Sequence, residues 1–100
     1  MMSAIHLNTL YLAAQTGGAE AERELFEYLG ARFRLFARHR VWSGADAEDI
    51  VQEVLLTVCR EYKTLNVTSS FAAWAYKVLD NRLLAYYHAQ RSQQRRSADR

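Results

Sequence analysis

The chain contains no proline and only four glycines in 100 residues, so few positions can interrupt a helix. Proline breaks helices and interior glycine weakens them, whereas most of the other residues present are compatible with a helix. Gly17 and Gly18 form one pair, and Gly44 follows Ser43, which indicates helix ends at these two places. Half of the residues are hydrophobic, enough for the core of one domain. The sequence therefore predicts an all-α fold in a single domain.

Hydrophobic periodicity predicts where the helices lie. We expect four helices, at about residues 4–15, 19–41, 47–62 and 71–89, with a loop at 63–70 between the last two. The segment after residue 91 is polar and basic, and a segment of this kind is typical of a disordered tail or the start of a linker. We therefore expect a compact four-helix domain over residues 1–91, followed by a basic tail over 92–100.

The predicted third helix has two distinct faces. Its first turn is acidic, and Asp46 is positioned to cap the free backbone N–H groups. The inward face at 100° per residue consists of Ile50, Val51, Val54, Leu55, Val58 and Tyr62. The opposite face carries Asp49, Gln52, Glu53, Leu56 and Arg60. Two carboxylates, an amide and an outward leucine favour a docking surface for a basic partner.

The predicted fourth helix is also two-faced. Phe71, Trp74, Ala75, Val78, Leu79, Leu83 and Tyr86 share its apolar side, opposite Lys77, Asp80, Asn81, Leu84, His88 and Arg91. Asparagine can bind base edges, and cationic side chains suit phosphates. Taken alone, however, this helix is explained more simply as having a solvated surface. The charge distribution adds to the argument, since residues 1–70 carry seven Lys/Arg against nine Asp/Glu and residues 71–100 carry six against two. This asymmetry indicates two different partners.

Other residue patterns limit the possible functions. His6, His39 and His88 lie on different predicted segments, and no phosphate-binding loop or nucleophile motif is present. We therefore expect no enzyme activity, no cofactor and no metal site. The single Cys59 fits a reducing cytoplasm and is interpreted as a small buried hydrophobe at the edge of the apolar face. Trp42 is expected to cover the corner between the second and third helices. We expect no membrane insertion, because no apolar run is long enough to span a bilayer.

Four segments, taken in order, resemble region 2 of a bacterial sigma-70-type sigma factor, and specifically the extracytoplasmic-function (ECF) group. They are Leu12-Ala-Ala-Gln-Thr-Gly-Gly-Ala-Glu-Ala, Asp46-Ala-Glu-Asp-Ile-Val-Gln-Glu, Val58-Cys-Arg-Glu-Tyr and Phe71-Ala-Ala-Trp-Ala-Tyr-Lys-Val-Leu-Asp-Asn-Arg, and the likeness runs from about Thr9 to Arg96. Housekeeping members carry paired tryptophans where this chain has Lys77 and Val78, and ECF members usually lack that pair. The resemblance implies a four-helix transcription initiation domain that binds RNA polymerase core and recognises the promoter minus-ten element during strand opening.

The resemblance also assigns roles to residues. It implies that Asp49, Gln52 and Glu53 dock on the clamp helices of the largest polymerase subunit, with Leu56 and Cys59 flanking that contact and Arg60 on the same face. It implies that the loop receives an extruded base of the non-template strand, with Lys63, Asn66, Thr68, Ser69 and Ser70 available to bind it. Lys77, Asn81, Leu84, His88 and Arg91 would follow the promoter strand.

The family also implies partners and segments beyond these residues. An anti-sigma factor commonly covers the same surfaces. The second, minus-35-reading domain of the family is not expected within these 100 residues. The alternative to the sigma assignment is a helical interaction module that binds polymerase or a regulator without recognising promoter DNA. Promoter protection distinguishes the two hypotheses.

Overall fold

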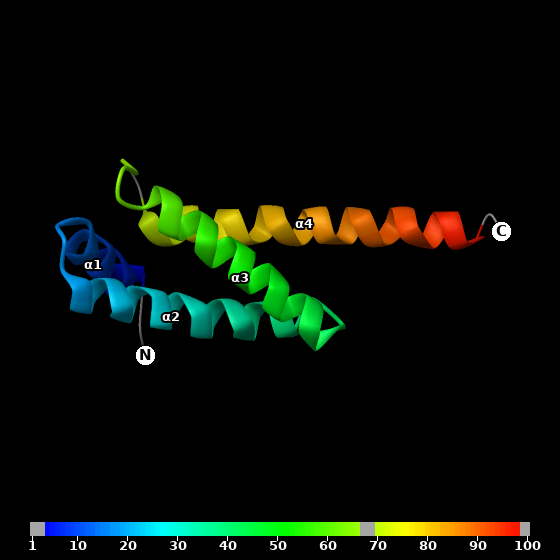
Figure 1. Ribbon diagram of the computed structural model, residues 1–100, viewed down its shortest axis with the longest axis horizontal. Helices are drawn as coiled ribbons and strands as arrows, with labels where there is room; N and C mark the ends of the chain where they lie inside the picture. The colour runs from blue at the N-terminus through cyan, green and yellow to red at the C-terminus, as the bar shows by residue number, and fades with distance from the viewer. Residues whose placement is uncertain (1–3, 67–69, 99–100) are drawn as a thin grey trace.

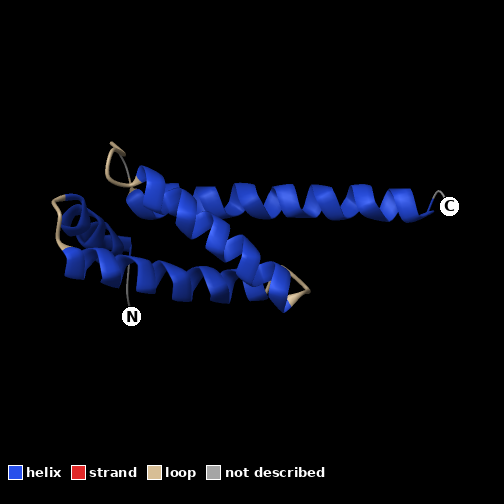
Figure 2. Ribbon diagram, in the orientation of Figure 1, coloured by secondary structure: helices blue, strands red, loops and turns tan. Residues whose placement is uncertain are grey.

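The structure is a computed structural model that describes residues 4–66 and 70–98. In these residues it contains the helices α1 (Ala4–Gln15), α2 (Ala19–Arg38), α3 (Gly44–Glu61) and α4 (Phe71–Ala98), and no strand is present in the part described (Figure 2). The predicted all-α, four-helix class is confirmed. Successive helices pack on one another, and α1 also packs on α4. The C-terminal half of α4 extends past the turn between α2 and α3 (Figure 1), which gives the molecule extents of 55 × 24 × 20 Å.

Both predicted helix boundaries at glycines are present. Gly17 adopts φ +95°, a backbone conformation that favours glycine, and its N–H donates to the Ala14 carbonyl oxygen at 3.1 Å.

α2 ends at Arg38, three residues earlier than predicted, and the N–H groups of Arg40 and Val41 both donate to the Ala37 carbonyl oxygen. Val41 is buried although it lies outside the helix. Its apolar side chain therefore extended the periodic pattern without extending the helix.

α3 begins three residues before the predicted start, and its cap differs from the prediction. Ser43 is the N-cap, and its Oγ accepts a 3.2 Å hydrogen bond from the Asp46 N–H. Asp46 is instead inside the first turn, where its Oδ2 accepts from the Tyr86 hydroxyl at 2.7 Å. The predicted capping role of Asp46 is wrong because a better-placed serine precedes the helix.

α4 continues nine residues beyond its predicted end, to Ala98. The helical backbone after residue 91 contradicts the predicted disorder of the tail. Arginine, glutamine and alanine are strong helix formers, and the chain has no glycine or proline after Gly44. The polar composition of the segment thus removed the periodic signal but not the helical propensity. The division into a domain over 1–91 and a tail over 92–100 stays a prediction.

The core lies between the apolar faces of all four helices. Its fully buried large side chains come from each element and include Leu7, Leu25, Leu29, Phe33, Ile50, Val54, Phe71, Leu79 and Leu83. Burying each such side chain contributes about 1.5–3 kcal/mol. Tyr11 and Phe71 stack with ring centroids 4.3 Å apart and planes at 8°, which fixes α1 against the start of α4.

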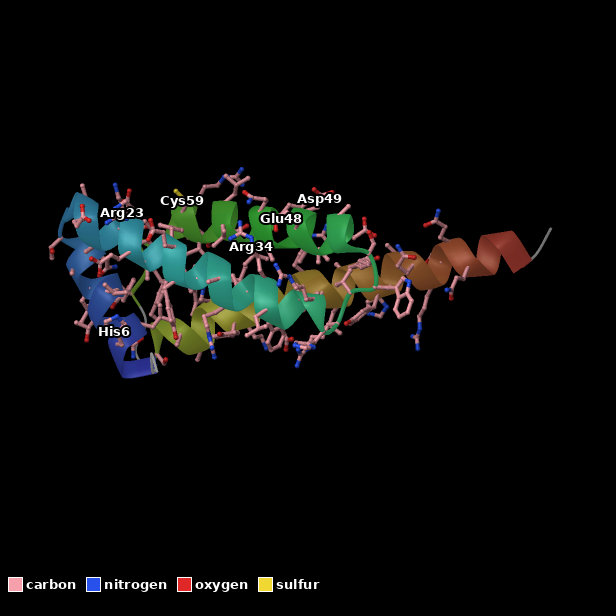
Figure 3. The ribbon with its side chains drawn as sticks, turned by 90° about the horizontal axis from the view of Figure 1, so that it is seen from below. His6, Arg23, Arg34, Glu48, Asp49 and Cys59 are labelled. Carbon is pink, nitrogen blue, oxygen red and sulfur yellow. The ribbon has the colours of Figure 1, made fainter. Side chains whose placement is uncertain are left out.

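Two sequence-based expectations about single residues are wrong. Cys59 is exposed rather than buried, because the buried position of this turn is taken by its neighbour Val58. Figure 3 shows Cys59 and Asp49 projecting from the same outer edge of α3. Trp42 does not cover the corner between α2 and α3, since it is fully exposed at 103% of its reference area. Val41 fills the corner in its place.

Candidate functional site

The predicted docking face of α3 lies on the surface. Its five residues are all exposed, and we call them the acidic ridge: Asp49, Gln52, Glu53, Leu56 and Arg60. Leu56 keeps 54% of its area exposed, which provides an apolar centre between polar neighbours. The structure therefore brings together the residues that the sequence placed on one face.

The carboxylates around the ridge differ in their intramolecular bonds. Arg34 of α2 donates from Nε and Nη2 to the Glu48 carboxylate at 2.9 and 3.0 Å, as seen between the labelled residues in Figure 3. Gln52 Nε2 donates to the same carboxylate at 3.1 Å. The Arg34 bond, assisted by Gln52, lowers the pKa of Glu48 to about 2. Part of the Gln52 amide is thus engaged within α3.

A second ion pair connects the ridge to α4. Arg82 Nε donates to the Glu53 carboxylate, and this bond lowers the pKa of Glu53. Beside it, a pocket of about 240 Å³ between α3 and α4 is lined by residues that include Asp46, Asp49 and Tyr86. Arg82 belongs to the sequence motif, but its role as a partner of Glu53 was not predicted. The pair could not be predicted from helical periodicity, because the two residues are 29 positions apart in the sequence.

The loop between α3 and α4 is held at its beginning by α1. The Leu65 carbonyl oxygen accepts hydrogen bonds from the Tyr11 hydroxyl at 2.8 Å and from Gln15 Nε2 at 2.9 Å. Gln15 Nε2 also lies 2.9 Å from the Tyr62 carbonyl oxygen. The buried Tyr62 donates from its hydroxyl to Glu22, so α2 contributes as well. Neither Tyr11 nor Gln15 was predicted as a site residue.

The predicted base-binding residues of the loop are only partly described. Lys63 and Asn66 are exposed, and Lys63 Nζ lies 3.8 Å from Glu22 Oε2. Ser70 instead caps α4, because its Oγ accepts from the Ala73 N–H at 3.2 Å. Its hydroxyl hydrogen is still available to a ligand. The predicted contacts Thr68 and Ser69 lie outside the described residues.

The end of the loop is also fixed by α1. Asn8 Oδ1 accepts from the backbone N–H groups of Phe71 and Ala72, at 3.1 and 3.4 Å. These are two of the N–H groups that a helix start leaves without an intrahelical partner. α1 thus positions both sides of the loop, although the sequence indicated no function for it.

The predicted strand-binding face of α4 is on the surface along its whole length. Its five residues are exposed and follow one side of the helix, and we call them the α4 face: Lys77, Asn81, Leu84, His88 and Arg91. Successive members are three or four residues apart, which is the spacing of one helical face. The aromatic Tyr76 does not belong to it, since it packs on Phe33 and Phe36 with centroids 5.3 and 5.8 Å away. The structure thus presents one polar stripe on α3 and another on α4.

Comparison with known proteins identifies this arrangement. The Sigma-70 region 2 family model matches residues 25–95, which include α3, the loop and most of α4. The chain belongs to the Sigma-70 region 2 family. This is a family of transcription factor domains rather than of enzymes, and sigma factors use region 2 in transcription initiation. No curated protein matched the chain in the comparison.

A solved structure shares the fold of this region 2 domain. It is described as the NMR structure of the complex formed by an engineered region 2 of sigmaE in complex with GTAAAA, and it superposes with a TM-score of 0.68 at 24% sequence identity. The match covers 93% of this chain and 97% of that chain. At this identity the likeness establishes the shared fold. α1 and the first residues of α2 lie before the family match although they hold the loop.

Two general features of the region 2 domain follow from the described residues. No helix among them is both long and apolar enough to cross a membrane. Within the same residues, no three histidine, cysteine or acidic side chains are grouped so that they could hold a metal ion.

Proposed function

We propose that this region 2 domain binds RNA polymerase core and recognises the minus-ten element during strand opening, as part of an ECF-type sigma factor. The observation that carries the proposal is the separation of two exposed stripes on adjacent helices. The acidic ridge lies on α3 and the α4 face lies on α4, with the Glu53–Arg82 ion pair between the helices. One small body can thereby bind a protein and a nucleic acid at the same time.

The polymerase contact is assigned to the acidic ridge. Asp49 is exposed and Leu56 is half-exposed two turns further along the same face of α3, so an anionic group and an apolar anchor share one surface. Charged rims of this kind steer association and exclude partners of the same charge. We assign the clamp helices of the largest subunit as the partner because the family resemblance of the motif at Asp46–Glu53 implies it. An anti-sigma factor would compete for the same ridge.

The DNA contact is assigned to the loop and the α4 face. Lys63 and Asn66 stand at the loop, and Lys77, Asn81 and Arg91 continue along α4. Amides can bind the edges of an unpaired base, whereas the cations bind phosphates. A flipped base bound in the loop would place the rest of the strand along the helix. Asn66 and Asn81 are therefore the residues that we expect to contribute to sequence preference.

Energetic magnitudes indicate that the domain acts only with polymerase. Stacking is worth about 1.4 kcal/mol per step, so opening roughly ten steps costs on the order of 14 kcal/mol. Capturing a flipped base offsets a few kcal/mol. The remainder must come from the polymerase contact and other DNA contacts. The isolated domain should therefore bind a single strand weakly and leave duplex DNA closed.

The polymerase assignment is tested by charge reversal. We expect the double variant D49K/L56A to bind bacterial core polymerase at least about tenfold more weakly, since like charges across an interface cost several kcal/mol. We avoid Glu53 because its reversal would also break the ion pair with Arg82. D80K is the matched control, because Asp80 is exposed on α4 away from the ridge. Equal core affinity for D49K/L56A and wild type would refute the assignment.

The DNA assignment is tested by salt dependence. If Lys63, Lys77 and Arg91 contact the phosphates of a single strand, the logarithm of the binding constant should fall with the logarithm of salt concentration at a slope of about −2. D80K should strengthen the same binding, because it removes an anion next to the α4 face. A salt-independent affinity would exclude the strand contact. Polymerase binding without promoter protection would favour the interaction-module alternative.

A further inference from the structure

The turn between α2 and α3 is fixed on both sides. Val41 is buried in the core, and Ser43 caps α3 through the Asp46 N–H. The Tyr87 hydroxyl of α4 donates to the Arg40 carbonyl oxygen at 2.7 Å. The turn therefore has a defined position against the middle of α4.

Trp42 lies in this fixed turn and yet none of its surface is buried. Its exposure is 103% of the reference area, although full burial of so large a ring is strongly favourable. The three residues that precede Val41 are Arg38, His39 and Arg40, all exposed. A turn with an exposed indole that follows cationic residues in the sequence is suited to a nucleic acid, which offers both flat bases and phosphates.

A groove on α4 lies beside the same turn. It has a volume of about 520 Å³ and is lined by Leu84, Tyr87, His88, Gln90, Arg91 and Gln94, none of which is acidic. By contrast, the pocket that opens between α4 and α3 includes the carboxylates of Asp46, Asp49 and Glu53. The groove therefore lies on the side of α4 that is better suited to bind an anionic ligand.

The Tyr87–Arg40 hydrogen bond brings the turn and the groove together. Trp42 follows Arg40 by two residues, so its backbone lies within about 7 Å of that of Arg40. Tyr87 lines the groove with 39% of its area exposed. We call this site the aromatic corner: Arg40, Trp42, Tyr87, His88 and Arg91. It combines two accessible aromatic rings with His88 and Arg91 of α4, while the Arg40 guanidinium lies 3.4 Å over the Phe36 ring.

We propose that the aromatic corner is a second nucleic-acid contact, at which Trp42 stacks on a base outside the minus-ten element. This inference rests on the proposed function, because the corner continues the α4 face through its shared residues His88 and Arg91. A protein partner is less favoured, since the groove lining contains no carboxylate to match a basic peptide. Stacking on a base is worth enough to change affinity measurably and tolerates any sequence.

The length of α4 places this contact away from the loop. Tyr87 is sixteen residues after Phe71, which at 1.5 Å per residue corresponds to about 24 Å. A strand that reaches both the loop and the corner must therefore follow α4 over about 24 Å.

The test uses the 100-residue chain and a fluorescein-labelled oligothymidylate of 20 nucleotides at low salt. W42A should weaken binding by about fivefold or more, whereas W42F should stay within about threefold of wild type because it retains an aromatic ring. L35A is the matched control, since Leu35 is also an exposed large hydrophobic residue of α2 outside the corner. Quenching of tryptophan fluorescence by the unlabelled strand should be smaller in W42A than in wild type.

The outcomes separate the two proposals. If W42A binds like wild type while K77A weakens binding, the aromatic corner is wrong and the strand contact on α4 stands. If W42A weakens binding while K77A and N81A do not, the corner is supported and the proposed strand path is wrong. If wild type does not bind the strand, both proposals fail. If W42A loses affinity only for polymerase core, the turn binds protein and the inference is overturned.

Discussion

The Tyr11 hydroxyl donates a 2.8 Å hydrogen bond to the Leu65 carbonyl oxygen, across 54 residues of sequence. The first helix thereby holds the loop that the proposed function assigns to base capture. We expect Y11F to lower the free energy of unfolding by about 1 kcal/mol, the typical contribution of one hydrogen bond. The stacking of this ring on Phe71 is retained in the variant. Urea denaturation measures the change, and strand affinity should fall while core affinity does not.

Asn8 provides a second prediction about α1. Removing its amide in N8A leaves the N–H groups of Phe71 and Ala72 without this acceptor, and a lost cap typically costs about 1 kcal/mol. We expect that loss in urea denaturation. N66A is the control, because Asn66 is exposed in the loop and should affect strand affinity alone. Unchanged stability of N8A would show that the cap contributes nothing.

Glu48 gives a prediction about pH. Its pKa is lowered from 4.5 to about 2, chiefly by Arg34 and then by Gln52. A carboxylate whose pKa is lower in the folded than in the unfolded state stabilises the fold at pH values above the unfolded-state pKa. That stability is lost as the pH falls from about 4.5 to about 2. E48Q lacks this contribution. The stability difference between wild type and E48Q should therefore shrink over that range, as measured by urea denaturation at pH 7, 4.5 and 3. A difference that is constant with pH would contradict the ion pair.

Cys59 gives a prediction about access to α3. Because the thiol is exposed, it should react with Ellman's reagent in the native protein as completely as in urea. A bulky maleimide adduct should then weaken binding to polymerase core, since Cys59 is near Leu56 at the end of the acidic ridge. Strand affinity should not change. C59S treated with the same maleimide controls for reaction elsewhere.

The sequence predicted the parts of this structure that depend on local pattern. The outward position of Asp49 and Leu56 followed from 100° periodicity, and the end of α1 followed from Gly17. Local pattern misjudged Cys59, because cysteine is often buried and its angular position lies at the edge of the apolar face. It also placed the end of α4 too early, since the periodic signal ended before the helical propensity did.

The contacts that position the candidate site could not be predicted in the same way. Asn8, Gln15 and Arg82 each bond a residue that is distant in sequence. Such pairs depend on how helices cross, which periodicity does not determine. Trp42 was misplaced for a related reason, since either it or Val41 could have filled the corner. Only the packed structure shows that valine occupies it.

The uninterrupted course of α4 has a mechanical consequence. At 1.5 Å per residue its 28 residues form a rod about 42 Å long, with no hinge residue such as glycine or proline within it. A force or tilt applied near Phe71 would reach the opposite end as rotation of a stiff lever rather than being absorbed by bending. The orientation of α4 at Phe71 would then determine the position of its far end at Ala98.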